Sequence, residues 1–140
     1  MMQKVRIEQI SFDLTWRIRH EVMYPDLPFD SIKLDNDKEG THFGLYVEDE
    51  LTAVVSLFHK NDSYQFRKFA TIVAAQGKGY GARLLEYLVS YVKNAGGKKL
   101  WCNARVSATG FYSKFGFATT HQTSVSKGID FVIMELQLNN

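Results

Sequence analysis

The sequence predicts an α+β domain built on a mixed, mostly antiparallel central sheet of six to seven strands flanked by helices. Three observations support this fold class. The chain has 140 residues, 45% of them hydrophobic, which is enough for one core without a disulfide or metal staple. Short segments typical of β-strands occupy both ends of the chain. One long amphipathic helix is predicted between them, over residues 79–94. We therefore expect one domain over residues 1–140.

The first half of the chain predicts one helix among strands. Ser11 is a candidate N-cap for a helix that runs to about Met23, and Pro25 ends it. The polar segment that follows, residues 26–40, predicts a loop with one helical turn. Alternating or β-rich segments predict four strands, at residues 5–10, 41–47, 51–58 and 63–73.

The second half begins with the clearest helix in the sequence. Gly79–Asn94 carries an apolar stripe, and Gly96 and Gly97 stop it. The stripe consists of Leu84, Leu85, Leu88, Val89 and Val92. A short helix is predicted over Ser107–Phe115, ended by Gly116. Three more strands are predicted, at residues 99–104, 117–125 and 129–138.

The composition excludes several classes of protein. A single cysteine and four scattered histidines argue against a disulfide framework and against a metal site. No apolar run approaches ~18 residues and the N-terminus is charged, so we expect no membrane-spanning helix, no signal peptide and a cytoplasmic location. No basic stripe with interleaved aromatic residues occurs, which argues against nucleic-acid binding.

The two halves of the chain carry opposite charge. Residues 1–65 have seven Lys/Arg against twelve Asp/Glu, and residues 66–140 have ten against three, for balances of −5 and +7. Solvated faces alone can produce this asymmetry. The alternative is that the second half meets an anion and the first half a cation.

A glycine-rich turn, Gln76–Ala82, lies between a predicted strand and the long helix. Glycine permits positive φ, and the free N–H groups of a helix start attract anions. Lys78 and Arg83 add positive charge, so the turn predicts a phosphate site. The spacing is not that of a Walker A loop, and no acidic residue follows at the distance that a dinucleotide site needs. A turn without any ligand is the alternative.

Three motifs in order resemble the GNAT superfamily of N-acetyltransferases. Gln76, Gly79 and Gly81 form the pattern Q-x-x-G-x-G, similar to the acyl-CoA pyrophosphate loop of that family. Residues 65–71 and 100–105 look like its fourth and fifth strands. Residues 108–117 match its A-x-x-F-Y-x-K-x-G-F element. The resemblance covers essentially the whole chain and implies a sheet splayed between the fourth and fifth strands.

The resemblance also implies a binding site for acetyl-CoA. By similarity, backbone groups of Phe69, Ala70 and Thr71 pair with the pantetheine arm, and Asn103 hydrogen-bonds it. Backbone N–H groups of the turn hold the pyrophosphate, from Gln76, Gly77, Lys78, Gly79, Tyr80, Gly81 and Ala82. For Asn103, capping of the next helix is the alternative.

Tyr112 stands where the family has its general acid. A phenol beside the sulfur can protonate or hydrogen-bond the departing thiolate, and a backbone N–H near Thr71 can stabilise the oxyanion. The alternative for Tyr112 is simple packing, although Phe111, Phe115 and Phe117 are better core candidates. Cys102 suggests a covalent acyl-enzyme, but its place inside a strand favours a small buried hydrophobe.

The general base is not assigned by the sequence. Many family members use a glutamate on the fourth strand, which here has no carboxylate. A free alkylamine is mostly protonated at pH 7, so a base or water must take a proton. The candidates from other elements are His42, His59, Asp62 and Asp130.

The acceptor side is expected in the first half of the chain. It would be bordered by Arg17, Arg19, His20, Tyr24, the Pro25–Pro28 loop and the acidic stretch Asp26–Glu39. We expect transfer of an acetyl group from acetyl-CoA to a primary amine, on a small molecule or a peptide, in a ternary complex. A non-catalytic acyl-CoA sensor with the same fold is the alternative. A monomer and a homodimer are both open.

Overall fold

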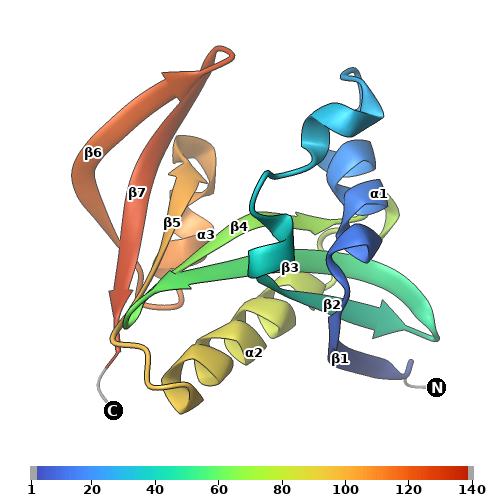
Figure 1. Cartoon of the computed structure of the whole chain (residues 1–140), viewed down its shortest axis with the longest axis horizontal. Helices are drawn as coiled ribbons and strands as arrows, with labels where there is room; N and C mark the ends of the chain where they lie inside the picture. The colour runs from blue at the N-terminus through green and yellow to red at the C-terminus, as the bar shows by residue number, and fades with distance from the viewer. Residues whose placement is uncertain (1–2, 139–140) are drawn as a thin grey trace. The chain divides into compact units, whose positions relative to one another are not determined.

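The computed structural model describes residues 3–138, which contain seven strands and three α-helices (Figure 1). The strands are hydrogen-bonded in the order β1-β2-β3-β4-β5-β7-β6. Their bounds are β1 Val5–Ile10, β2 Thr41–Val47, β3 Glu50–Lys60, β4 Ser63–Thr71, β5 Lys99–Arg105, β6 Ala118–Ser126 and β7 Ile129–Gln137. The pairs β1–β2, β2–β3, β5–β7 and β6–β7 are antiparallel, whereas β4 and β5 run parallel. This mixed, mostly antiparallel sheet confirms the α+β fold class.

The α-helices differ greatly in length, since α2 has 15 residues, α3 has five and α1 has three. Their bounds are α1 Trp16–Ile18, α2 Tyr80–Asn94 and α3 Thr109–Ser113. Short 3-10 turns are η1 Phe12–Thr15, η3 Phe29–Ile32, η4 Asp37–Glu39, η5 Val73–Ala75 and η6 Val106–Ala108, and η2, Arg19–Met23, is a π-helical turn.

The chain forms two compact units. The first comprises the chain up to Phe58 together with Arg67–Leu88, and the second comprises His59–Phe66 and the chain from Val89 onward. Strand β4 therefore begins in the second unit and ends in the first. One domain over residues 1–140 stays a prediction.

The core of the first unit lies between its strands and α2. The register pairs Phe43 of β2 with Val55 of β3, and both side chains are at most 1% exposed. Leu84, Leu85 and Leu88 of α2 are fully buried, which confirms the apolar stripe for this part of the helix. A smaller cluster packs Ile10, Ile18, Val54 and Ala70 together.

The prediction of one regular helix from Ser11 to Met23 is wrong. The segment is divided into η1, α1 and η2, so its hydrogen-bond pattern changes twice. Ser11 has the extended conformation of a cap residue, but its Oγ donates to Asp13 Oδ1 at 2.6 Å and accepts no capping hydrogen bond from a helix N–H. The loop after Pro25 contains two helical turns, η3 and η4, where one was expected.

The second unit is built on β5, β7, β6 and the first residues of β4. Pairing of β4 with β5 covers three residue pairs, from Ser63↔Lys99 to Gln65↔Trp101. Such short pairing is what a sheet that splays between its fourth and fifth strands requires. Leu100, Cys102 and Ala104 alternate on the buried face of β5. The register of β6 shifts between Thr119 and Thr123, which marks a bulge in this strand.

Candidate active site

The glycine-rich turn of the first unit contains two residues in the left-handed conformation. Gly77 has φ +79° and Gly79 has φ +87°, and a Cβ added at either would meet no atom within 4 Å. Backbone conformation rather than space therefore requires glycine here. The residues from Gln76 to Gly79 are exposed, so a ligand can reach the backbone of the turn.

Helix α2 starts directly after this turn. Its first helical hydrogen bond runs from Arg83 N–H to Gly79 O at 3.1 Å. The N–H groups of Tyr80, Gly81 and Ala82 precede that bond, so the helix itself cannot satisfy them. They lie at the positive end of the helix dipole, where an anion is stabilised.

Gln76 has a different role from the predicted one, because its hydrogen-bonding groups are engaged within the protein. Its backbone N–H already donates to Val73 O at 3.2 Å, within η5. Its side-chain Nε2 donates to Thr71 O at 2.9 Å. Gln76 therefore ties the end of β4 to the turn, and the remaining N–H groups of the turn are the better candidates for an anion.

The end of β4 presents alternate backbone groups to its neighbour β3. Ile72 N–H donates to Thr52 O at 2.9 Å. By the two-residue repeat of an extended strand, the backbone of Ala70 also faces β3, whereas Phe69 and Thr71 face away from it. The strand is irregular at Lys68, which has φ +55°. Its Nζ donates to the Tyr24 hydroxyl at 3.0 Å.

Tyr112 lies in the second unit, on α3, within an aromatic cluster. Ring centroids are 5.7 Å from Phe66, 5.2 Å from Phe111 and 6.0 Å from Phe117. Burial raises the pKa of the phenol, and nearby Cys102 raises it further. Its hydroxyl hydrogen-bonds to no residue between 3 and 138. Tyr112 therefore stays protonated at neutral pH with its O–H available.

Cys102 is buried beside this cluster. Burial raises the pKa of its thiol to about 12, so no thiolate forms at neutral pH. Because the thiolate is the nucleophilic form, Cys102 is not a nucleophile. The interpretation as a small buried hydrophobe is confirmed.

Asn103 lies on the opposite face of β5 from Cys102 and lines a cavity of about 250 Å³ within the second unit. The lining residues are Gln65, Trp101, Asn103, Gln122, Thr123, Ser124 and Ile133. Of these residues, only Asn103 was predicted from the sequence as part of a site. The available signal was the two-residue alternation of β5, which puts Trp101 on the same face as Asn103.

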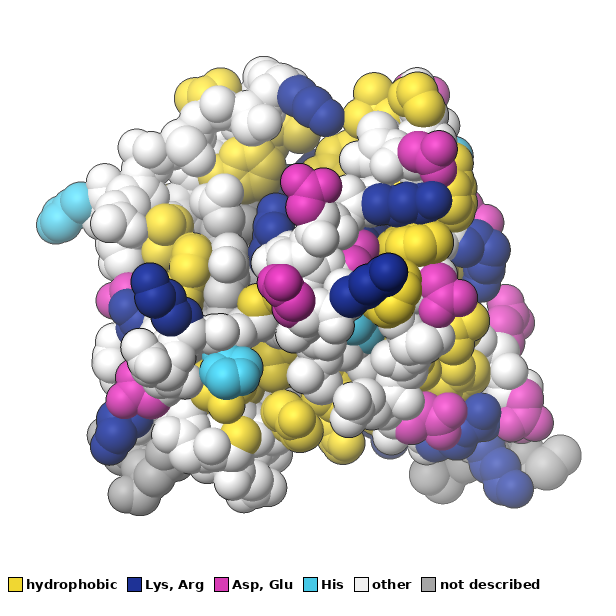
Figure 2. Space-filling view, viewed as in Figure 1, with side chains coloured by type: hydrophobic (Ala, Val, Ile, Leu, Met, Phe, Trp, Pro, Cys, Tyr) yellow, Lys and Arg dark blue, Asp and Glu magenta, His cyan; other side chains and the backbone are white. Residues whose placement is uncertain are grey.

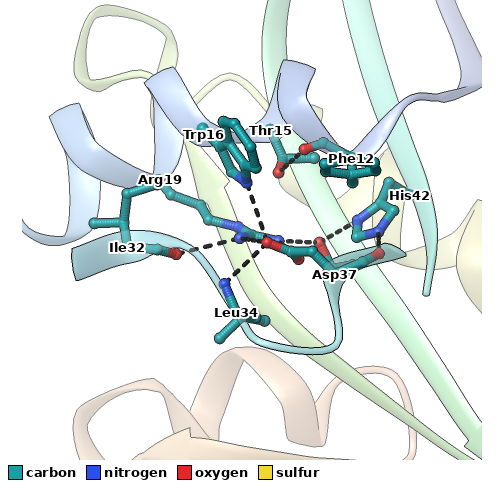
Figure 3. Close-up of polar contacts among 9 residues, drawn as sticks. Phe12, Thr15, Trp16, Arg19, Ile32, Leu34, Asp37 and His42 are labelled. Carbon is teal, nitrogen blue, oxygen red and sulfur yellow. Dashed lines mark hydrogen bonds and ion pairs between the residues drawn. The ribbon is translucent and has the colours of Figure 1, made fainter. Parts of the chain in front are cut away.

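Two residues predicted near the acceptor are instead partners in a buried ion pair (Figure 3). Arg19 is fully buried, and its Nη2 donates to Asp37 Oδ1 at 2.8 Å and its Nη1 to Oδ2 at 2.9 Å. Arg19 also donates to Ile32 O and Ser56 Oγ. Arg19 and Asp37 are thus wrong as surface residues of an acceptor cleft.

Asp37 is held ionised by its neighbours. Burial alone would raise the pKa of this carboxyl, but hydrogen bonds from Arg19, from Leu34 N–H and from Trp16 outweigh burial and hold the pKa at about 2. Within the described chain, Nε of Arg19 is buried without a hydrogen-bond partner. The pair therefore joins α1, η2 and the following loop into one polar cluster.

His42 belongs to the same cluster and is wrong as a general base. Its Nε2 lies 2.7 Å from Asp37 O, and its Nδ1 lies 2.7 Å from Ser56 Oγ. A carbonyl can only accept, so Nε2 carries the proton and Nδ1 accepts from the Ser56 hydroxyl. Burial lowers the pKa of His42 and keeps the ring neutral. Neither nitrogen is available for an amine.

The other residues predicted to border the acceptor or to act as the base lie in separate places and have different partners. Arg17 pairs with Glu21 at 3.2 Å on the surface, and His20 Nε2 lies 2.8 Å from Leu27 O. His59 stacks on Tyr64 with ring centroids 4.8 Å apart. Asp62 and Asp130 are exposed. Among residues 3–138, no group of three His, Cys, Asp or Glu side chains could hold a metal ion.

Comparison with known proteins identifies the family. A family model described as an acetyltransferase (GNAT) domain matches residues 15–138. The chain therefore belongs to the GNAT acetyltransferase family, and it is an acyltransferase enzyme. None of the described helices is long and apolar enough to cross a membrane.

Two bacterial relatives carry the same assignment. The uncharacterized N-acetyltransferase YitI of Bacillus subtilis is 26% identical over 122 residues, which are 81% of this chain and 82% of the relative. An uncharacterized N-acetyltransferase of Bacillus pumilus is 30% identical over 99 residues, or 63% of this chain, which spans 59% of that relative.

Solved structures share the fold at lower sequence identity. One assigned as an N-acetyltransferase from Lactobacillus plantarum has a TM-score of 0.85 at 21% identity, covering 96% of this chain and 99% of its own. An acetyltransferase of Bacillus subtilis in complex with CoA has a TM-score of 0.75 at 17% identity, covering 99% and 100%.

Proposed function

We propose that this enzyme transfers an acetyl group from acetyl-CoA to a primary amine, on a small molecule or a peptide, by direct attack within a ternary complex. Membership of the GNAT family supports the reaction class. Two structures with this fold were solved with CoA and with acetyl-CoA bound, which supports a CoA-type donor.

The donor's pyrophosphate would bind at the glycine-rich turn. The left-handed glycines and the helix N–H groups of residues 80–82 suit an anion there. Lys78 is exposed in the same turn and adds positive charge. Phe69 and Thr71 would pair with the pantetheine arm, because their backbone groups face away from β3, although Thr71 O already accepts from Gln76 Nε2 and would contribute mainly its N–H. Asn103 would hydrogen-bond the same arm.

Tyr112 carries the proposal for catalysis. When bound, the donor supplies an activated thioester whose departing thiolate needs a hydrogen bond or a proton. Burial raises the pKa of the Tyr112 phenol, so the group stays protonated at neutral pH and its unused O–H can donate that hydrogen bond. The ordinary pKa of a thiol lies below that of a phenol, so Tyr112 acts first by donating a hydrogen bond to the thiolate.

The attacking amine would lose its proton to water. Strand β4 has no carboxylate between Ser63 and Thr71, and both ring nitrogens of His42 are engaged. A water-mediated route to bulk solvent predicts a rate that rises with pH as the amine itself is deprotonated. A buried carboxylate base would instead give a plateau above its own pKa.

Calorimetric titration with acetyl-CoA tests the donor site, with dephospho-CoA and ATP as controls. Micromolar binding of acetyl-CoA and weaker binding of both controls are expected. Thiol release in the presence of an amine panel then tests turnover. Binding without turnover on any amine would favour an acyl-CoA sensor, and absence of binding would overturn the donor site.

A further inference from the structure

The cavity of the second unit is lined by polar side chains whose hydrogen-bonding groups are unused. The side chains of Gln65, Trp101 and Asn103 hydrogen-bond to no residue between 3 and 138. The side-chain amide of Gln122 and the hydroxyls of Thr123 and Ser124 are also without such partners. Asn103, Gln122, Thr123 and Ser124 are exposed, so water takes their hydrogen bonds in the free protein and a ligand can replace it.

The fold builds this cavity from three strands and the start of β4. Gln65 pairs with Trp101 across β4 and β5, and Asn103 pairs with Ile133 across β5 and β7. These four side chains share one face of the sheet. The bulge in β6 is held by Thr120, whose Oγ1 donates to Ile133 O at 2.9 Å. The bulge lies beside the β6 residues that line the cavity, Gln122, Thr123 and Ser124.

The cavity is uncharged. None of the seven lining residues carries a charge. Lys99 and Glu135, which lie next to the cavity on the same face of the sheet, neutralise each other in an ion pair with 3.5 Å between Nζ and Oε2. In Figure 2 the area over β6 and β7 is mainly white and yellow, whereas charged side chains crowd the area over α1. An ammonium-rich or acidic ligand body would find no counter-ion among the lining residues.

We infer that this cavity binds the body of the acceptor, and that this body is an uncharged aromatic or heteroaromatic ring bearing the amine. The half-buried indole of Trp101 and the Ile133 side chain offer apolar surface to a planar ring. The amides of Gln65 and Gln122 can bond polar atoms on its edge. The inference rests on the proposed function, because Asn103, the proposed pantetheine ligand, forms part of the same wall.

The first unit is the less suitable place for acceptor recognition by charge. Its acidic stretch was expected to attract a cation, but Asp37 is buried against Arg19 and Asp30 pairs with Lys33 at 2.9 Å. The carboxylates available for a cationic acceptor are therefore fewer than the sequence suggests.

Indole N–H signals test the cavity directly. The chain has two tryptophans, so ¹⁵N-tryptophan labelling of the full chain gives two indole signals. The indole N–H of Trp16 donates to Asp37 at 3.1 Å and is the internal reference. We expect tryptamine, with acetyl-CoA present, to shift the Trp101 signal in a saturable manner and to leave the Trp16 signal in place. Spermidine should shift neither.

Steady-state kinetics test the same site by substitution. Trp101→Ala should raise the KM for tryptamine about tenfold, Trp101→Phe should restore most of the affinity, and both should bind acetyl-CoA as the wild type does. Gln65→Leu should raise KM as well, whereas the exposed Gln137→Leu is the matched control and should not.

The outcomes separate this inference from the proposed function. If acetyl-CoA binds and spermidine or a lysine peptide is acetylated with no effect of Trp101→Ala, the cavity is not the acceptor site although the enzyme assignment stands. If no aromatic amine shifts the Trp101 signal while acetyl-CoA binds, the inference is overturned in the same way. If acetyl-CoA does not bind, the donor site fails, and a saturable Trp101 shift would still support the cavity.

Discussion

Two polar regions of this protein differ in whether their side chains hydrogen-bond to other residues of the protein. In the first unit, the buried side chains of Arg19, Asp37 and His42 lie together (Figure 3). Arg19 and His42 each also hydrogen-bond to the buried Ser56. In the second unit, the amides, hydroxyls and indole around the cavity bond no described residue. The first region is a structural connection, and the second has hydrogen-bonding capacity left for a ligand.

The comparison shows that residue type alone does not identify a functional group. Arginine, histidine and aspartate are common in active sites, but Arg19, His42 and Asp37 are buried here and hydrogen-bond to buried partners. Tyr112 illustrates the other case, because its ring is packed while its hydroxyl is unused. Hydrogen-bonding capacity that a ligand can reach is therefore the better criterion for a candidate site, and the Nε of Arg19, which has no partner in the described chain, is too buried to meet it.

The largest expected effect is on the buried network. Asp37→Ala leaves the guanidinium of Arg19 fully buried without its counter-ion, which should destabilise the fold by about 3–5 kcal/mol. Urea unfolding followed by circular dichroism measures the loss. Glu21→Ala, which removes only the exposed Arg17–Glu21 pair, is the control and should change stability by less than about 0.5 kcal/mol. Equal effects would mean that the buried pair is no more important than a surface pair.

The next effect is on catalysis through the unused hydroxyl. Tyr112→Phe should lower kcat by about 100-fold, because the phenol no longer donates to the departing thiolate, while acetyl-CoA affinity stays close to wild type. Stopped assays of thiol release and calorimetry measure the two quantities. Tyr87→Phe is a matched control, since Tyr87 is exposed on α2. Unchanged kcat in Tyr112→Phe would remove this residue from the mechanism.

Lowering the pH should reduce the stability that the buried network contributes, in two steps. The folded pKa of His42 is below 6.5, so its contribution is complete above about pH 6.5 and declines as pH falls and the unfolded chain takes up the proton. The folded pKa of Asp37 is about 2, so its contribution of about 2 kcal/mol is lost as pH falls from about 4 to 2.

Urea midpoints measured between pH 7 and pH 2 follow both steps. Asp37→Asn should remove the lower step and keep the upper one. A wild-type midpoint that is flat from pH 7 to pH 3 would contradict the assignment of His42 as a neutral, buried ring.

The smallest effect concerns the glycine-rich turn. Gly79→Ala forces a side chain into φ +87° and should cost about 1 kcal/mol while weakening acetyl-CoA binding. Gly110→Ala is the matched control, because Gly110 lies in α3 with open space around an added Cβ, and helix propensity predicts a small gain. A thermal melt and calorimetry distinguish them, and the same sign for both would show that φ at Gly79 is not the constraint.

Local sequence patterns predicted most of the fold. The apolar stripe of α2 and the glycines that follow it are local signals, and the hairpins were marked by alternation and turn residues. The segment from Ser11 to Met23 was less predictable. Its side chains are engaged with distant residues, as in the bond from Arg19 to Asp37, and local propensity does not contain these partners.

The candidate site divides in the same way. Spacing and motif identified Gly77, Gly79 and Tyr112, because each belongs to a pattern of residues that are close together in the sequence. Trp101 and Gln65 were missed, because they meet only when β4 pairs with β5.

The sequence by itself determined the class of fold, the family and the position of the glycine-rich turn, because each depends on short-range order along the chain. Only the tertiary structure decided which polar residues are available. Whether Arg19 and His42 face solvent or bond buried partners depends on Asp37 and Ser56, which are 18 and 14 positions away, and the cavity around Trp101 includes residues of β6, a strand that follows it in the chain. Burial and hydrogen-bond satisfaction are properties of such long-range contacts, which the order of residues alone does not display.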